Sequence, residues 1–173
     1  MTELTLRAPV AADLPALAAL GVAAFVAKFG ELYRPEDLIP FLVDTHSEQA
    51  WQRDLADPQR RTMVAFRGEV PVGWAKLALA ASFAEHARGR RTMELKQLYT
   101  APHAQGSGIG KALMDWAMAE FATLGADEVQ LSVWFDNTGA QRFYARYGFA
   151  KVADVTFAVG EQRDHEFLFA RAI

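Results

Sequence analysis

The chain of 173 residues contains no cysteine. Without a thiol it cannot form a disulfide bond, hold zinc or an iron–sulfur cluster through sulfur, or attack a substrate with a cysteine nucleophile. A chain of this length is typical of one domain that buries its own hydrophobic core. We therefore expect a single domain over residues 1–173 in a reducing compartment such as the cytoplasm.

An excess of positive charge is also missing. The 18 lysines and arginines are outnumbered by 21 aspartates and glutamates, whereas a domain that binds nucleic acid is usually strongly basic. The longest uncharged run near the start, residues 14–27, is shorter than the roughly 20 apolar residues of a membrane span. The first residues lack the basic and apolar blocks of a signal peptide. We expect a cytoplasmic protein that binds neither nucleic acid nor membrane.

Helix patterns dominate the first third of the chain. Apolar residues at helical spacing predict a helix over residues 13–28. A second, short helix should follow and break at Pro40. Thr45 and Glu48 form a capping-box pattern, which predicts that a third helix opens there.

Strand patterns follow, and then strands alternate with helices. The sequence predicts a hairpin, an exposed loop over 80–92 and a third strand, followed by a glycine-rich loop, a helix, a strand, a second helix and a closing hairpin. The predicted strands are 62–66, 70–79, 93–100 and 128–135, and the helix after the last of these is 137–148. This order predicts a mixed α/β sheet with helices on its faces.

The stretch "QLYTAPHAQGSGIGKAL", residues 97–113, has Gly106, Gly108 and Gly110 at alternate positions ahead of Lys111. Glycines let the backbone turn its N–H groups toward an anion, and the start of the following helix adds the positive end of its dipole. Lys111 would add a point charge for a phosphate. Taken alone, the loop is explained equally well by a glycine turn without a ligand.

Three well-known glycine loops do not match this stretch. A Walker loop needs glycine and Ser or Thr where the chain has Gln105 and Ala112. A dinucleotide-binding loop needs G-x-G-x-x-G directly after a strand, and here the spacing is G-x-G-x-G. The hydrolase motif G-x-S-x-G fails because Ser107 has Gln105 and Ile109 two residues away. The pattern that remains is Q-x-x-G-x-G.

Two segments, "LYTAPHAQGSGIGKALM" and "SVWFDNTGAQRFYARYGF", together resemble the acetyl-CoA-binding core of the GNAT N-acetyltransferase superfamily over residues 62–150. More loosely, "AAFVAKFGELY", "EQAWQRDL" and the closing "FAVGEQRDHEFLFARAI" are similar to bacterial spermidine/spermine N-acetyltransferases. The resemblance implies the GNAT fold, an α/β (α+β) architecture with a mixed central sheet of about six to seven strands and about four helices. It also implies acetyl-CoA as cosubstrate and no metal.

The resemblance further implies which residues hold acetyl-CoA. In the family the loop holds the pyrophosphate, the strand before it pairs its backbone with the pantetheine arm, and an Asn and a Tyr flank the pantetheine and its sulfur. The implied binding residues are Leu98, Tyr99, Thr100, Gln105, Gly106, Ser107, Gly108, Ile109, Gly110, Lys111, Asn137 and Tyr144.

Tyr144 and Glu94 are the expected catalytic residues. A phenol with a pKa of about 10 keeps its proton at neutral pH and can donate it to a departing thiolate. The transfer is uphill, so we expect it to be late or partial. A backbone N–H near Leu98 or Tyr99, where the resembling strand carries a bulge, is expected to stabilise the oxyanion.

Glu94 occupies the place where several family members carry a general base. Strand alternation predicts that it shares a face with Lys96, Leu98 and Thr100. An unperturbed glutamate is a weak base for an ammonium group and needs desolvation or a water relay. A structural ion pair of Glu94 with Lys96 or with a loop arginine is the alternative.

The acceptor is the least defined part of the prediction. Carboxylates in the early helical segments favour a polyamine, whereas the arginine-rich loop over 80–92 speaks against one. We expect direct transfer of an acetyl group from acetyl-CoA to a primary amine of a small molecule, with a polyamine as one candidate. Protein N-terminal or antibiotic acetylation is an alternative, as is a non-catalytic acyl-CoA sensor or interaction module. A homodimer is compatible with the sequence.

Overall fold

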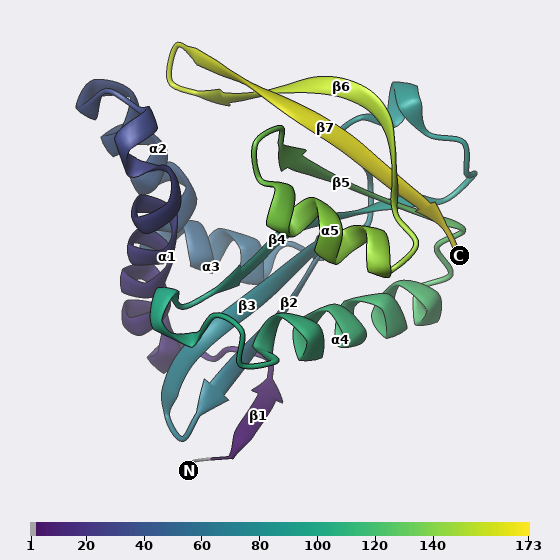
Figure 1. Ribbon diagram of the computed structural model, residues 1–173. Coiled ribbons are helices and arrows are strands. Elements are labelled where there is room, and N and C mark those ends of the chain that lie inside the picture. The colour runs from purple at the N-terminus through teal and green to yellow at the C-terminus, as the bar shows by residue number, and fades with distance from the viewer. Residues whose placement is uncertain (1–2) are drawn as a thin grey trace.

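The structure, a computed structural model, describes residues 3–173 (Figure 1). Seven strands in this part of the chain form one mixed sheet in the order β1-β2-β3-β4-β5-β7-β6. Neighbouring strands are antiparallel except β4 and β5, which are parallel. The expected mixed α/β sheet is confirmed. The strands are β1 (Leu4–Arg7), β2 (Arg60–Arg67), β3 (Val70–Ala78), β4 (Thr92–Thr100), β5 (Glu128–Trp134), β6 (Ala150–Val159) and β7 (Gln162–Ala172).

Helices cover both faces of the sheet. One face, which we call the α4 face, carries Met93 and Leu131, and both are buried in one core with residues of α4. Helix α5 packs against the same core. The α1 face carries Val64 and Trp74, which are buried in a second core with residues of α1 and α3. The described residues thus hold five α-helices, against about four expected. They are α1 (Leu14–Phe29), α2 (Pro35–His46), α3 (Glu48–Ala56), α4 (Ile109–Thr123) and α5 (Thr138–Arg146).

Two predictions about the early helices are wrong. Helix α2 continues through Pro40 instead of breaking there. The proline is exposed near the start of the helix, so water can bond the carbonyl group that loses its intrahelical partner. Ser47 rather than Thr45 caps α3, because its Oγ accepts a hydrogen bond of 3.1 Å from the backbone N–H of Ala50.

Helix α1 is unusually apolar. With its flanking turns it forms a stretch, Ala11–Leu32, which by length and composition alone could cross a membrane, and an 18-residue window of it has a mean hydropathy of 1.6. Its inner side packs onto the sheet, where Leu14 and Leu17 are buried beside Trp74. Its outer side leaves Val22 and Val26 exposed.

The parallel strands β4 and β5 separate soon after they begin. They pair only from Thr92↔Glu128 to Glu94↔Gln130. Beyond that point, residues 95–100 of β4 and 131–134 of β5 have no strand partner on the edges that face each other. We call this part of the sheet the open seam. Backbone N–H and C=O groups on such edges are free to bind another extended chain.

A β-bulge at Lys96 sets the face of each β4 side chain. Lys76 of β3 pairs with Gln97, and the next residue, Leu77, pairs with Leu95, so Lys96 has no partner across the strands. One extra residue shifts the alternation of side chains from there on. The sequence pattern carries no sign of this shift.

The bulge overturns one expectation about β4. Glu94 does not share a face with Leu98 and Thr100, because Glu94 and Tyr99 point to the α1 face and Leu98 and Thr100 to the α4 face. We expected the bulge near Leu98 or Tyr99, but it lies earlier in the strand, at Lys96.

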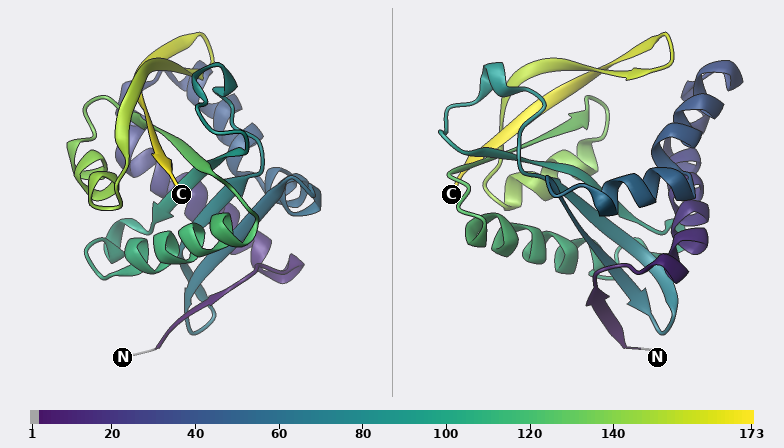
Figure 2. Two further views of the ribbon diagram at one scale, coloured as in Figure 1. Left: turned by 90° about the vertical axis from the view of Figure 1, so that its right-hand side faces the viewer. Right: turned by 180° about the vertical axis from the view of Figure 1, so that it is seen from behind.

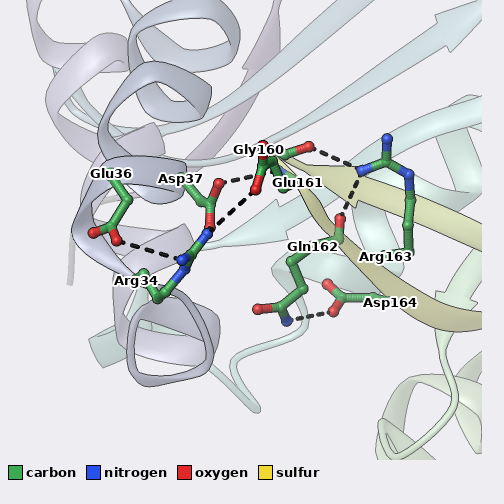
Figure 3. Close-up of polar contacts among 8 residues, drawn as sticks. All are labelled: Arg34, Glu36, Asp37, Gly160, Glu161, Gln162, Arg163 and Asp164. Carbon is green, nitrogen blue, oxygen red and sulfur yellow. Dashed lines mark hydrogen bonds and ion pairs between the residues drawn. The ribbon is translucent and has the colours of Figure 1, made fainter.

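The tip of the β6–β7 hairpin reaches the start of α2, far from it in sequence (Figures 1 and 2). Asp37 accepts a hydrogen bond of 3.0 Å from the backbone N–H of Glu161. Its other oxygen accepts bonds from the Arg34 guanidinium at 3.0 and 2.8 Å, as Figure 3 shows. The Glu161 N–H and the guanidinium together lower the pKa of Asp37. We call this the Asp37 clasp.

Candidate functional site

The glycine-rich loop joins β4 to α4 and leaves its backbone open. Gly106 and Gly108 have φ angles of 74° and 81°, the left-handed region that only glycine adopts readily. A Cβ built on either glycine meets no atom within 4 Å. The first helical hydrogen bond runs from Ala112 N to Gly108 O, at 3.0 Å. The N–H groups of residues 109–111 therefore have no acceptor within residues 3–173, as a site for a pyrophosphate requires.

Several side chains around the loop bond to the backbone or to one another. The Ser107 hydroxyl donates to the carbonyl oxygen of Ala104. Lys111 forms an exposed ion pair of 2.6 Å with Asp115, and the Tyr147 hydroxyl donates to the other oxygen of Asp115 at 2.7 Å. Burial and Asp115 raise the pKa of Tyr147 to about 12. Gln105 is exposed ahead of the glycines. The backbone offers the free donors here, and Lys111 already has a carboxylate partner.

The open seam connects this loop to the middle of the sheet. Leu98 and Thr100 lie on the α4 face of β4, and Thr100 approaches Gly110, whose built Cβ would be 3.9 Å from Thr100 Cγ2. The free edge of β4 over these residues leads directly into the loop. An extended pantetheine arm can pair with this edge, as the sequence predicts.

Asn137 and Tyr144 stand on the β5 side of the seam. Asn137 caps α5 by accepting a hydrogen bond of 3.2 Å from Ala140 N–H. Tyr144 packs against Phe143 and Phe149, and burial raises the pKa of its phenol above the usual value. Tyr144 therefore keeps its proton throughout the physiological range and can serve as a hydrogen-bond donor.

Tyr99 differs from its neighbours in β4. Its ring stacks on Trp74 with centroids 4.9 Å apart and an interplanar angle of 9°. Burial raises the pKa of Tyr99, and Glu166 and Tyr144 raise it further. Only the backbone of Tyr99 can face a ligand on the α4 face, while its side chain lines the α1 face of the seam.

Glu94 lies at the point where the seam opens. It is 5% exposed. Its Oε2 accepts a hydrogen bond of 2.7 Å from the backbone N–H of Ser82, and its Oε1 lies 3.3 Å from Lys96 Nζ. The expected alternative, an ion pair with Lys96, is therefore present. Both oxygens of this carboxylate are held by donors.

Further polar residues that the sequence reasoning missed lie on the α1 face. Glu166 of β7 pairs with Trp134 of β5, and Asp164 accepts a hydrogen bond from the Tyr33 hydroxyl. Gln130, which pairs with Glu94, is fully buried, and its amide nitrogen and oxygen have no hydrogen-bond partner among residues 3–173. The alternation in "RDHEFLFARA" places Asp164 and Glu166 on one face, so a signal was available.

The two faces of the seam therefore differ in chemistry. The α4 face offers a free strand edge, free N–H groups and Tyr144, which suit an acyl-CoA. The α1 face offers three carboxylates, Glu94, Asp164 and Glu166, which suit a cation.

Comparison with known proteins identifies the family of the chain. The model of the acetyltransferase (GNAT) family matches residues 26–149. An uncharacterized N-acetyltransferase of Mycobacterium tuberculosis is 32% identical over 162 residues, which cover 93% of this chain and 98% of the relative. The mycothiol acetyltransferase of Propionibacterium freudenreichii is 29% identical over 157 residues, 89% of this chain and 46% of that protein.

Solved structures share the fold at low sequence identity. The PaiA N-acetyltransferase of Thermoplasma acidophilum, solved in complex with coenzyme A, has a TM-score of 0.78 at 19% identity and covers 99% of both chains. Since the family model spans residues 26–149, which include the glycine-rich loop and Tyr144, the chain belongs to the GNAT family and is an N-acetyltransferase that uses acetyl-CoA.

Proposed function

We propose that the protein transfers the acetyl group directly to a primary amine of a small molecule, while both substrates are bound. The observation that carries the proposal is the open seam, which has donors for an acyl-CoA on one face and carboxylates on the other. The two substrates can then meet where β4 and β5 separate. Holding two reactants in this way is worth several kcal/mol in general, about 7–11 at best.

Direct transfer agrees with the residues present. The chain has no cysteine to carry the acetyl group as a thioester. Tyr144 keeps its proton because burial raises its pKa, so it supplies a hydrogen bond to the leaving sulfur. Full proton transfer from so weak an acid comes late, as the charge on sulfur develops.

The carbonyl oxygen of the thioester needs a donor as it gains charge. The free edge of β4 in the open seam, from Leu95 to Thr100, carries backbone N–H groups that no strand occupies. We assign the oxyanion donor to this edge. One well-placed donor of this kind contributes about 10²–10³ in rate.

The charge around the seam favours a cationic acceptor. Glu94, Asp164 and Glu166 lie on the α1 face, where the acceptor enters. The arginines of the 80–91 loop are exposed, and their backbone N–H groups bind Asp127 and Glu128 at the start of β5. These arginines therefore lie at the end of the seam where β4 and β5 are still paired. A polyamine remains one candidate, beside monoamines.

The test is the release of coenzyme A from acetyl-CoA in the presence of monoamines, diamines, spermidine, amino acids and a peptide with a free N-terminus. We expect release of coenzyme A with small primary amines and an N-acetyl product of the correct mass. Double-reciprocal plots of the initial rate, with both substrates varied, should give intersecting lines. Parallel lines would contradict direct transfer. Acetylation of the peptide alone would contradict a small-molecule acceptor.

A further inference from the structure

Two of the carboxylates on the α1 face of the seam, Glu94 and Glu166, have different surroundings. Glu94 is bound through one oxygen by a backbone N–H and lies beside an ammonium group through the other. Both oxygens of Glu94 are therefore already engaged by groups of the protein.

Glu166 has the opposite environment. It lies on β7 opposite Trp134, and Trp134 packs edge-on against Phe29 at the end of α1, with centroids 5.9 Å apart. Burial among these groups raises the pKa of Glu166, and the nearby Asp164 and Glu94 raise it further. The side chain of Ser132 and the ammonium of Lys96 oppose this rise. The result is a carboxylate that accepts a proton more readily than a free glutamate.

The placement of Glu166 also connects it to the reaction centre. Strand register puts Glu166 on the α1 face together with Gln130 and Trp134. The charge of Glu166 raises the pKa of Tyr99, and so does Tyr144. Glu166 and the expected acid Tyr144 are thus both near Tyr99.

Gln130 adds an independent sign that a polar group binds here. Its amide is 0% exposed and both its polar atoms lack a partner in residues 3–173. Buried amides in native proteins nearly always have a partner in the protein, a water molecule or a ligand. Gln130 pairs with Glu94 of β4 and lies on the same face of the sheet as Glu166, four residues before Trp134 in β5.

We propose that Glu166, rather than Glu94, is the carboxylate that takes the proton from the acceptor ammonium. This assignment rests on the proposed function. An N–H bond of the ammonium breaks, its proton moves to a carboxylate oxygen of Glu166, directly or through water, and the electron pair stays on nitrogen. The nitrogen then forms a bond to the thioester carbon, the C–S bond breaks, and sulfur takes the proton of Tyr144.

The protons balance over one turnover. As the amide forms, nitrogen loses its second proton, which restores the Tyr144 hydroxyl through water. Glu166 releases its proton to solvent. One ammonium ion and one acetyl thioester thus become one amide, one thiol and one proton.

The closing experiment measures kcat against pH with acceptors of the same shape but different amine pKa, such as an alkylamine and its fluorinated analogue. If Glu166 is the base, the acid limb of the wild-type profile reports its pKa and keeps its position with every acceptor. In Glu166→Gln the limb should move with the acceptor, and kcat at pH 7 should fall about 10²-fold. A wild-type limb that follows the acceptor pKa would overturn the assignment without any variant.

Two further variants complete the design. Glu94→Gln should lower kcat less than tenfold and leave the acid limb of the pH profile in place. Loss of the acid limb in this variant would show that Glu94 is the base. Glu166→Asp keeps the charge, so its kcat should be lower while the acid limb still keeps its position with every acceptor. This variant covers the case in which Glu166→Gln does not fold. Transfer to amines that is unchanged in Glu166→Gln defeats this proposal alone. Absence of transfer to any amine defeats the proposed function and this proposal with it.

Discussion

The imidazole ring of His46 lies directly against Gly21. A Cβ built on the glycine would be 2.6 Å from His46 Nδ1, and the ring is 1% exposed. The contact brings α1 and α2 together above an aromatic group that includes Phe25 and Trp74.

Gly21→Ala should therefore destabilise the protein although alanine favours helices. The added methyl group forces His46 out of its position, and overpacking of this kind costs about 1–3 kcal/mol. The measurement is urea unfolding at pH 7.5. Gly139→Ala is the matched control, because that glycine lies in α5 with nothing within 4 Å of a built Cβ, so it should gain about 0.5–1 kcal/mol. Equal stability of both variants would contradict the contact.

His46 should make stability depend on pH. Burial lowers its pKa to about 4, from 6.5, so the unfolded chain takes up a proton at a higher pH than the folded one. The stability it contributes is complete above pH 6.5 and is lost as the pH falls toward 4, by about 3 kcal/mol in all. Unfolding free energies measured between pH 7.5 and 4.5 should show this slope. His46→Gln should flatten it, whereas His103→Gln, at an exposed position, should leave it unchanged.

Gly108→Ala should weaken binding of acetyl-CoA. The residue caps α4 with a φ of 81°, and a side chain there costs about 1–2 kcal/mol in strain and projects in front of the free N–H groups. We expect at least a tenfold rise in Kd by calorimetry. Gly125→Ala carries the same strain at the other end of α4, with a φ of 76°. That variant should lose stability and keep its affinity; an equal loss of affinity in both would refute a specific role of the loop.

Tyr144→Phe should lower kcat about 10²-fold, because it removes the hydrogen bond to the leaving sulfur and keeps the ring. The Kd for acetyl-CoA should change little. Tyr147→Phe is the control on the same helix end, since its hydroxyl binds Asp115 on the surface. Steady-state kinetics at saturating substrates separate the two, and an unchanged kcat in Tyr144→Phe with chemistry rate-limiting would remove the residue from catalysis.

The Asp37 clasp should affect the acceptor and not acetyl-CoA. Asp37→Ala removes the anchor of the hairpin tip, while Tyr33 and Asp164 beside it line the acceptor side. We expect a several-fold higher KM for the amine with an unchanged KM for acetyl-CoA. The control is Asp44→Ala, which removes only an exposed ion pair with Arg53. A rise in both KM values would show general unfolding instead.

Much of the fold followed from the sequence because its elements are local, and the resemblance to the family supplied the residues expected to hold acetyl-CoA. The glycine loop, the helix after it and Tyr144 lie within two short segments, and strand and helix periods mark their borders. The prediction of a helix break at Pro40 was wrong because the exposed start of α2 tolerates the lost hydrogen bond. The predicted face of the Glu94 side chain was wrong because a one-residue bulge leaves no trace in the hydrophobic pattern.

The acceptor side was harder to predict for a different reason. Tyr33 and Asp164 meet only because β7 inserts between β5 and β6 and the hairpin tip returns to α2. Alternation could place Glu166 on a face of its strand, but not on the same face of the sheet as Glu94. The partners that hold the Glu94 carboxylate, one of them a backbone N–H from a loop, are likewise visible only in three dimensions.

The short pairing of β4 with β5 also has a consequence for folding cooperativity. Three residue pairs join the two halves of the sheet, so the amides along this junction should open and exchange with solvent more readily than those inside either half. A bound pantetheine would act as a missing strand between them. Acetyl-CoA should therefore slow hydrogen exchange in β4 and β5 together, and stabilise the protein in proportion to the logarithm of its concentration above Kd.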